Sequence, residues 1–286
     1  MSDTLLDSIL VSTLGVDDKS CFIYAPRQTF LVDGSFPWQK VVEEVLCGPG
    51  LAESATGLGR GGIFFLSGAW LPCPIVVRQY RHGGFWRFLS GARFFNRYRF
   101  LAEIKLHTLV GRMGIPVPEA LGVIVVKKGL KSIFVNGYFV TRRLPDSLGL
   151  PEFLEQVGAA TRLRIAFEIG AYLRKLHEHG IFYTDLHVKN ILVGSEGGIF
   201  FIDFDKAKQY RAPLSTFRRR VNLYRFLRSV EKYCYRGGKL TDADRAAFLI
   251  AYEPDPEKYL KLYHQLGFGR VWRKFFYKFG WWLNRS

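Results

Sequence analysis

A polar segment that turns abruptly apolar, LHEHGIFYTDLHVKNILV (176–193), restricts the fold more than any other part of this chain. Asp185 and Asn190 stand five residues apart in it, and Asn190 directly precedes the β-prone run Ile-Leu-Val. A second short apolar run, IFFI, ends at Asp203. If the two runs form a hairpin, Asn190 and Asp203 meet at its open end, with Asp185 beside them.

These three side chains are the parts that a phosphoryl-transfer site needs. Carboxylate and amide oxygens suit Mg²⁺, with phosphate oxygens completing its shell. We therefore expect Asn190 and Asp203 to bind Mg²⁺, which leaves Asp185 to accept a proton from a hydroxyl group. The competing interpretation is two turn or capping acids and an ordinary asparagine.

Upstream segments offer groups for a nucleotide. The glycine-rich run GLGRGG (57–62) lets backbone N–H groups approach phosphates closely, although glycine clusters also mark ordinary turns. The D-x-x-x-x-N and I-D-F spacing resembles that of protein-kinase-like enzymes. This resemblance implies a phosphate-binding lysine at the position of Arg78 in PIVVR, with Glu103 in FLAEIKL placed to pair with it. Glu103 as a solvated helix acid is the other interpretation. The expected nucleotide-binding residues are Gly57, Gly59, Arg60, Gly61, Gly62, Arg78, Glu103 and, at a hinge beside adenine, Thr141 and Arg142.

The order of elements predicts an α+β fold in two parts. Most of the front half reads as strands with one helix over 100–114, and the back half reads as helices, the clearest over 161–180. We place the boundary between residues 1–144 and 145–286, at a Pro- and Gly-marked turn. Thr241 and Asp244 have capping-box spacing. Residues 1–50 give no clear assignment.

Composition limits the class of protein. With 48% hydrophobic residues the chain can bury a large core, and its formal charge of +16 predicts an anionic partner. The four cysteines show no metal or disulfide spacing. The N-terminus has no secretory pattern, and Gly and Pro interrupt the longest uncharged run, so we expect neither a signal peptide nor a transmembrane helix.

The D-x-x-x-x-N and I-D-F motifs resemble those of the protein-kinase-like bilobal fold, with a β-rich N-lobe and a mainly helical C-lobe. Tyr183 and Thr184 replace the His-Arg of the usual catalytic loop, Asp205 replaces the glycine after Asp203-Phe204, and no A-P-E follows. These departures separate the chain from eukaryotic-type protein kinases. VVRQYRHGGFWRFL, AEIKLHTLVGRMGIPVPEAL and FIDFDKAK resemble the bacterial lipopolysaccharide-core kinases, with 3-deoxy-D-manno-octulosonic acid (Kdo) kinases as the nearest branch.

This resemblance covers roughly residues 57–208. It implies ATP, Mg²⁺ and a lipid-anchored anionic saccharide acceptor, with the 4-hydroxyl of Kdo on a lipid A precursor as the acceptor group. It also implies that an arginine at position 78 is the normal residue in this branch of kinases and not a damaged lysine. His187 and Lys189 stand where many relatives have Asn and His, which makes an inner-core heptose the next choice. A protein or small-molecule kinase and a non-catalytic binding module of kinase fold stay open as alternatives.

Basic and aromatic segments fit an acceptor at a membrane. Six arginines and no acid occur from Arg78 through Arg99. At the C-terminus, VWRKFFYKFGWWLNRS predicts a helix with aromatic and basic residues on opposite faces. Two arrangements are consistent with this pattern: the helix lies on the cytoplasmic face of the inner membrane, or it packs on the C-lobe. No nucleic-acid-binding motif is present, so we do not expect nucleic acid as the anionic partner. The lipid-anchored acceptor and the basic, aromatic segments together predict a peripheral membrane enzyme.

Overall fold

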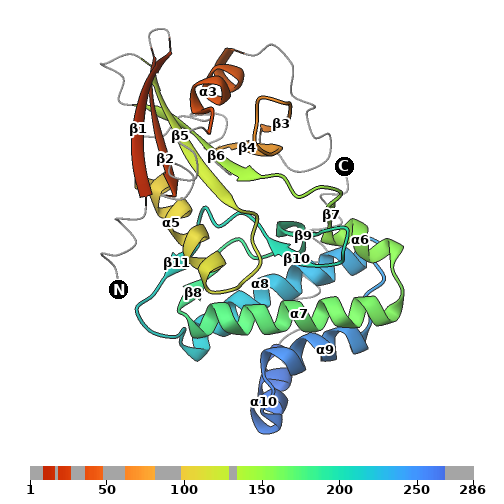
Figure 1. Ribbon diagram of the computed structural model, residues 1–286. Coiled ribbons are helices and arrows are strands. Elements are labelled where there is room, and N and C mark those ends of the chain that lie inside the picture. The colour runs from red at the N-terminus through yellow and green to blue at the C-terminus, as the bar shows by residue number, and fades with distance from the viewer. Residues whose placement is uncertain are drawn as a thin grey trace. The chain divides into compact units, whose positions relative to one another are not determined.

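The computed structural model describes residues 9–16, 19–26, 36–47, 62–80, 98–128 and 134–267. The chain divides into two compact units, Met1–Leu144 and Pro145–Ser286, and each is described by itself. An antiparallel sheet dominates the first unit and helices dominate the second (Figure 1). The α+β class expected from the sequence is therefore confirmed.

The first unit is built on a six-stranded sheet with the order β1-β2-β5-β6-β4-β3, in which all neighbours are antiparallel. Residues 1–50 had no clear assignment from sequence patterns, and their described part contributes two strands and one helix. The elements of this unit are β1 (Ile9–Val16), β2 (Lys19–Pro26), α3 (Trp38–Cys47), β3 (Ile63–Leu66), β4 (Ile75–Gln79), α5 (Tyr98–Arg112), β5 (Ala120–Lys128) and β6 (Val135–Arg142).

Apolar residues cover both faces of this sheet, which explains the uninterrupted run GVIVV in β5. Successive side chains of a strand point to opposite faces. Ile124 and Val126 accordingly join the core cluster that contains Trp38 of α3, whereas Val123 and Val125 join the cluster that contains Phe100 of α5. Burial on two faces fixes the central strands firmly and gives β4 and α5 rigid support.

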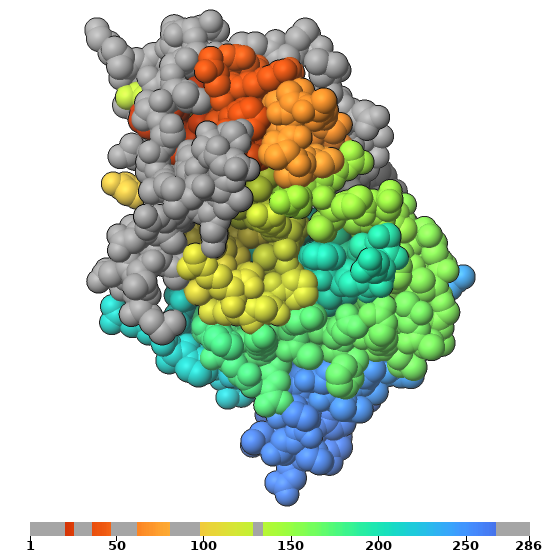
Figure 2. All heavy atoms as spheres, in the orientation of Figure 1, coloured from red at the N-terminus to blue at the C-terminus, as the bar shows by residue number. Residues whose placement is uncertain are grey.

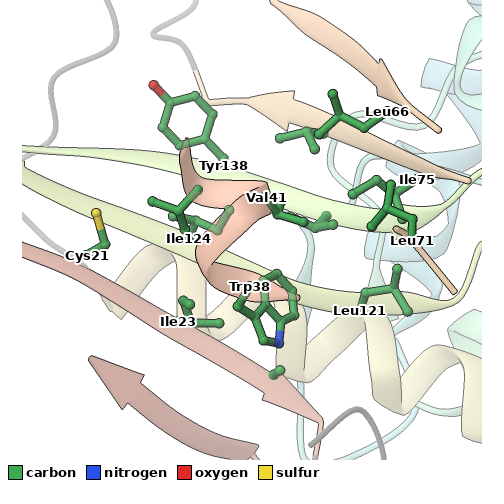
Figure 3. Packing of buried hydrophobic residues seen from close by; sticks show 14 of the residues in the cluster. Cys21, Ile23, Trp38, Val41, Leu66, Leu71, Ile75, Leu121, Ile124 and Tyr138 are labelled. Atoms are coloured by element: carbon green, nitrogen blue, oxygen red, sulfur yellow. The ribbon is translucent and has the colours of Figure 1, made fainter. Parts of the chain in front are cut away.

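The α3 side of the sheet shows how closely the layers pack. Trp38 and Val41 project from α3 onto the strands, toward Ile23 and Leu121 (Figure 3). Gly122 lies beneath the indole, and a Cβ atom there would be 2.6 Å from the Trp38 ring. Glycine is therefore required at this position for Trp38 of α3 to pack against the sheet.

The second unit combines five α-helices with short strands in its described residues. One small sheet has the order β10-β9-β7, and β11 pairs with β8. The elements are β7 (Leu148–Gly149), α6 (Leu150–Gln156), α7 (Ala159–Glu178), β8 (Ile181–Phe182), the 3-10 turn η1 (Val188–Asn190), β9 (Ile191–Val193), β10 (Ile199–Phe201), β11 (Lys208–Gln209), α8 (Thr216–Tyr235), α9 (Asp242–Tyr252) and α10 (Pro256–Gly267).

Helices α7 and α9 make the closest contact in this unit. A Cβ atom at Gly170 would lie 2.2 Å from the backbone oxygen of Phe248, so the crossing requires glycine. The predicted capping box opens α9: the Thr241 side chain accepts from the Asp244 N–H, and the Asp244 carboxylate accepts from the Thr241 N–H. Figure 2 shows α9 and α10 (blue) bordering the surface of α7 (green).

No helix in the described part of the chain combines the length and the apolar character that a bilayer-spanning segment needs. The predicted C-terminal amphipathic helix and the arginine-rich stretch after Tyr80 fall outside the described residues, as do Gly57, Gly59, Arg60 and Gly61.

Candidate active site

Arg78 and Glu103 form an ion pair in the first unit. Arg78 lies on β4, and its Nη2 is 2.6 Å from Oε1 of Glu103 on α5. The Glu103 side chain is fully buried, whereas 24% of the Arg78 side chain is exposed. A buried carboxylate needs an opposite charge, so this pair fixes the direction of the guanidinium. The structure thus brings together the two residues that the sequence placed at a phosphate site.

A buried histidine one turn after Glu103 holds α5 to the following turn. The Nε2–H of His107 donates to the Pro118 carbonyl at 2.6 Å. The pKa of His107 is lowered to about 4, mainly by burial and to a smaller extent by the positive charge of Arg78, against the opposite effect of the bond to Pro118. His107 is therefore neutral near pH 7 and does not compete with Arg78 for Glu103.

Three other predicted nucleotide-binding residues lie at strand ends. Gly62 precedes β3, and its carbonyl accepts from the Gln79 N–H at 2.8 Å. Thr141 and Arg142 are paired within β6 with both β4 and β5, rather than lying in a free hinge. The Arg142 side chain pairs with Glu119 at 2.6 Å on the surface. An adenine contact from Thr141 or Arg142 would thus come from their side chains.

In the second unit, Asp185 and Asn190 belong to one compact loop. The Asp185 side chain is 51% exposed, and its Oδ1 lies 3.9 Å from Nε2 of His187. Asn190 is buried, and its Nδ2 donates to the Asp185 carbonyl at 2.9 Å. Because a carbonyl can only accept, this bond assigns the Asn190 amide orientation and leaves Oδ1 as a separate acceptor.

The predicted hairpin brings Asp203 to this loop. β9 and β10 pair antiparallel, with Phe201 opposite Ile191. The ladder continues one step further, since the Ile202 N–H donates to the Asn190 carbonyl at 3.0 Å. Asp203 follows immediately and has a φ of 67°, a left-handed conformation that Asp adopts more readily than most residues. The backbone therefore changes direction at Asp203, directly after the hairpin.

This pair of oxygen donors fits Mg²⁺ better than other protein-bound metals. No group of three or more His, Cys, Asp or Glu residues gathers to hold a metal ion among the residues that the structure describes. Zinc and calcium sites generally need more protein ligands than one carboxylate and one amide. Mg²⁺ commonly keeps several waters and takes further oxygens from substrate phosphates. Asp203 and the free Oδ1 of Asn190 match that donor set.

Three side chains of α8 hold the Asp185 loop along its length. Asn222 bonds both backbone groups of Tyr183, with its Oδ1 accepting at 3.2 Å and its Nδ2 donating at 2.6 Å. Nη1 of Arg225 donates to the Thr184 carbonyl. Oγ of Ser229 accepts from the Val188 N–H at 3.0 Å. These bonds fix the backbone of the loop against a 20-residue helix.

The helix side chains in these contacts repeat at nearly whole turns, at positions 222, 225 and 229, so they share one face of α8. Sequence reasoning missed all three residues. The signal was present as two small polar residues, Asn222 and Ser229, seven positions apart on a helix whose other polar residues are mostly charged.

His177 extends this network into the core. Oδ1 of Asn222 is an acceptor, so Nε2 of His177 at 2.9 Å is the protonated nitrogen. Nδ1 then accepts from the Tyr252 hydroxyl at 2.7 Å. Burial lowers the pKa of His177 to about 4, and the charge of Arg219 contributes. His177 is therefore a buried, neutral residue that joins α7 to α8 and α9.

Tyr183 connects the loop to the segment after β10 that carries Asp203. Its ring is fully buried and stacks on Phe204, with ring centroids 4.5 Å apart. Its hydroxyl donates to the Ile202 carbonyl. Tyr183 replaces a histidine of the usual kinase loop, and here it bonds to the residue directly before Asp203.

A cavity of about 200 Å³ lies elsewhere in this unit, among α6, α7, α8 and α9. Most of its lining is apolar, and Val188 connects it to the Asp185 loop. None of Asp185, Asn190 and Asp203 lines it, so it is separate from the candidate site.

Comparison with known proteins identifies a family and several relatives. Residues 58–252 match the model of the family described as lipopolysaccharide kinase (Kdo/WaaP). A 3-deoxy-D-manno-octulosonic acid kinase of Xylella fastidiosa (strain 9a5c) is 30% identical over 198 residues, which cover 68% of this chain and 75% of that protein. A kinase of the same name from Vibrio vulnificus (strain CMCP6) is 28% identical over 211 residues, covering 70% and 82% respectively.

Proposed function

Because the chain belongs to the lipopolysaccharide kinase (Kdo/WaaP) family, we propose that it phosphorylates the 4-hydroxyl of Kdo on a lipid A precursor. It is a phosphotransferase that uses ATP and acts on a sugar hydroxyl of lipopolysaccharide. The choice of Kdo is supported by the relatives, which are named as kinases of 3-deoxy-D-manno-octulosonic acid. One structural observation supports phosphoryl transfer most: a single bonded loop carries Asp185 and Asn190 to the β9–β10 hairpin, and Asp203 follows the second strand of that hairpin.

Asp185 is assigned to the acceptor hydroxyl. Its carboxylate is half exposed, on a backbone that Asn190, Asn222 and Arg225 hold in place. A carboxylate held beside a hydroxyl can orient it and accept its proton as the oxygen attacks phosphorus. Positioning of this kind accounts for much of the rate enhancement in phosphoryl transfer.

Asn190 and Asp203 are assigned to Mg²⁺, through Oδ1 and the carboxylate. When bound, the ion would neutralise charge on the phosphate oxygens of ATP. The chain's own contribution is to hold these two donors at the open end of the β9–β10 hairpin, where backbone bonding fixes their separation.

Arg78 is assigned to the ATP phosphates, and Glu103 to holding it. Arginine offers several planar N–H donors, so one can bind the carboxylate while others face phosphate oxygens. The glycine-rich segment 57–62 would supply backbone N–H groups to the same phosphates. Thr141 and Arg142 are assigned to the adenine side.

The positive charge of the chain is assigned to an anionic acceptor and membrane surface rather than to nucleic acid. The second unit carries exposed basic side chains on and after the Asp185 loop, namely Lys189, Lys206, Lys208, Arg211, Arg218 and Arg225. An anionic lipid surface attracts such residues, by about 1 kcal/mol for each one near it. We place the enzyme peripherally on the cytoplasmic side of the inner membrane.

An acceptor panel tests the proposal. Purified enzyme, labelled ATP and Mg²⁺ are combined with Kdo-bearing lipid A precursor, with a heptosylated core and with a generic protein substrate. We expect label on the Kdo acceptor, and NMR of the product should place the phosphate on the 4-hydroxyl. Label on the heptosylated core alone would overturn the Kdo assignment, and label on protein alone would overturn the saccharide proposal.

A further inference from the structure

Arg225 of α8 bonds to the backbone of the Asp185 loop and uses one of its donors there. Its Nη1 donates to the Thr184 carbonyl, and Thr184 directly precedes Asp185. A guanidinium has five N–H donors, and this bond takes one of them. Arg225 is exposed on α8, so the remaining donors face solvent next to the loop.

The surroundings of Arg225 differ from those of the arginines that this chain pairs with acids. Arg78, Arg142, Arg162, Arg164 and Arg174 each have an acidic side chain within 4.0 Å. In the described part of the chain Arg225 has no such acid. Its charge is therefore available to an anion from outside the chain.

We propose that Arg225 forms an anion-binding subsite that takes the carboxylate of the acceptor sugar. The inference rests on the proposed function, because it needs an acidic sugar at Asp185. A 3-deoxy-octulosonic acid carries its carboxylate on the same ring system as the hydroxyl that is phosphorylated. One residue anchored beside Asp185 can therefore hold the acid while Asp185 meets the hydroxyl.

The bond to Thr184 makes Arg225 a suitable anchor. It fixes one edge of the planar guanidinium, so less side-chain freedom is lost when an anion binds. The free edge can form two parallel N–H···O bonds to a carboxylate. Phosphates of a lipid A precursor present the same oxyanion chemistry, so the experiment has to distinguish the two sources.

The test compares variants with modified acceptors. Arg225→Gln removes the charge but keeps an N–H donor, and Arg225→Lys keeps the charge but not the planar fork. Arg236→Ala is the matched control, because it removes an exposed arginine from the far end of α8. Acceptors are the native Kdo lipid, its carboxyl methyl ester and a lipid from which the phosphates have been removed. KM and kcat are measured for acceptor and for ATP, together with the melting temperature.

For Arg225→Gln we expect KM for the native acceptor to rise about 10- to 100-fold, the usual range for losing a charge-assisted bond. KM for ATP should stay unchanged, Arg225→Lys should lie between Gln and wild type, and Arg236→Ala should match wild type. With the methyl ester, wild type and Arg225→Gln should become equal, because the interaction is already lost.

Four results would overturn the subsite. Arg225→Gln could weaken both native and esterified acceptors equally, or lower kcat on every acceptor with KM unchanged, and either result would limit Arg225 to supporting the loop. Equal behaviour of wild type and Arg225→Gln on the dephosphorylated lipid alone would assign Arg225 to a lipid phosphate. If wild type transfers no phosphate to any Kdo acceptor, the proposed function fails and the subsite fails with it.

Discussion

The amide of Asn222 bonds both backbone groups of Tyr183, and this relationship carries the rigidity of α8 to the loop that holds Asp185. The same amide oxygen accepts from His177, so a single buried side chain serves three partners. A loop fixed in this way can present a half-exposed carboxylate in one position, which phosphoryl transfer requires.

Replacing Asn222 by Ala should destabilise the second unit by about 2–4 kcal/mol, because three buried polar groups lose their partner. Urea denaturation measures this loss. Ser229→Ala is a matched control on the same helix face. It removes one bond to the loop, from the Val188 N–H, together with the bond that the hydroxyl donates to the Phe226 carbonyl within α8, and it should cost about 1 kcal/mol. An Asn222→Ala variant as stable as wild type would contradict the role given to the network.

The two buried histidines should make folding stability depend on pH. Burial lowers the pKa of both His107 and His177 to about 4, against about 6.5 in an unfolded chain. Between these values the unfolded chain binds protons that the folded chain does not, so stability falls as pH drops from 6.5 toward 4. Each histidine should account for roughly 3 kcal/mol of this loss, which is absent above pH 6.5.

Denaturation at pH 7.5 and pH 5.0 checks this, with His177→Gln compared against wild type. The Gln variant cannot take up the proton, so its stability should change less between the two pH values. An equal change in both proteins would show that His177 does not titrate as its burial implies.

Arg78 and Glu103 should act as a unit. Arg78→Lys keeps the charge but shortens the side chain, and we expect kcat/KM for ATP to fall about tenfold, with a larger loss for Arg78→Ala. Glu103→Gln should reduce activity similarly, because the guanidinium loses its orienting charge. A double variant no worse than either single variant would support the coupling, whereas additive losses would argue against it.

Asp203→Asn should separate folding from Mg²⁺ binding. Asn tolerates the left-handed backbone at this position, so the melting temperature should stay near that of wild type. The loss of the carboxylate should raise the Mg²⁺ concentration needed for half-maximal activity by tenfold or more. Chelation by EDTA should abolish transfer by wild type. An unchanged Mg²⁺ requirement in Asp203→Asn would remove Asp203 from the metal site.

Local patterns were enough to predict much of this structure. The helix expected at 161–180 is α7 at Ala159–Glu178, and the predicted β9–β10 hairpin forms. The Thr241–Asp244 capping box is present on α9, and the Arg78–Glu103 contact was anticipated from motif order. In each case the signal lies in one short segment or in a known order of segments.

Long-range support for the site could not be predicted in the same way. Asn222, Arg225 and Ser229 bond to residues about 40 positions earlier in the chain. Helical periodicity shows that they share a face, but it does not show which loop that face meets. Likewise β1, β2 and α3 depend on contacts far along the chain, because their own apolar runs are short: β2 pairs with β5, β1 pairs with β2, and α3 packs on the sheet.

Asp185→Asn tests the central claim most directly. The substitution keeps the size of an exposed side chain and leaves the backbone bond from Asn190 intact, so the protein should fold normally. Phosphate transfer from labelled ATP to Kdo-bearing lipid A precursor is measured for wild type and variant. We predict transfer by wild type and a loss of about a hundredfold or more in the variant. Equal rates in the two proteins would contradict the role of Asp185, and no transfer by either would contradict the Kdo acceptor.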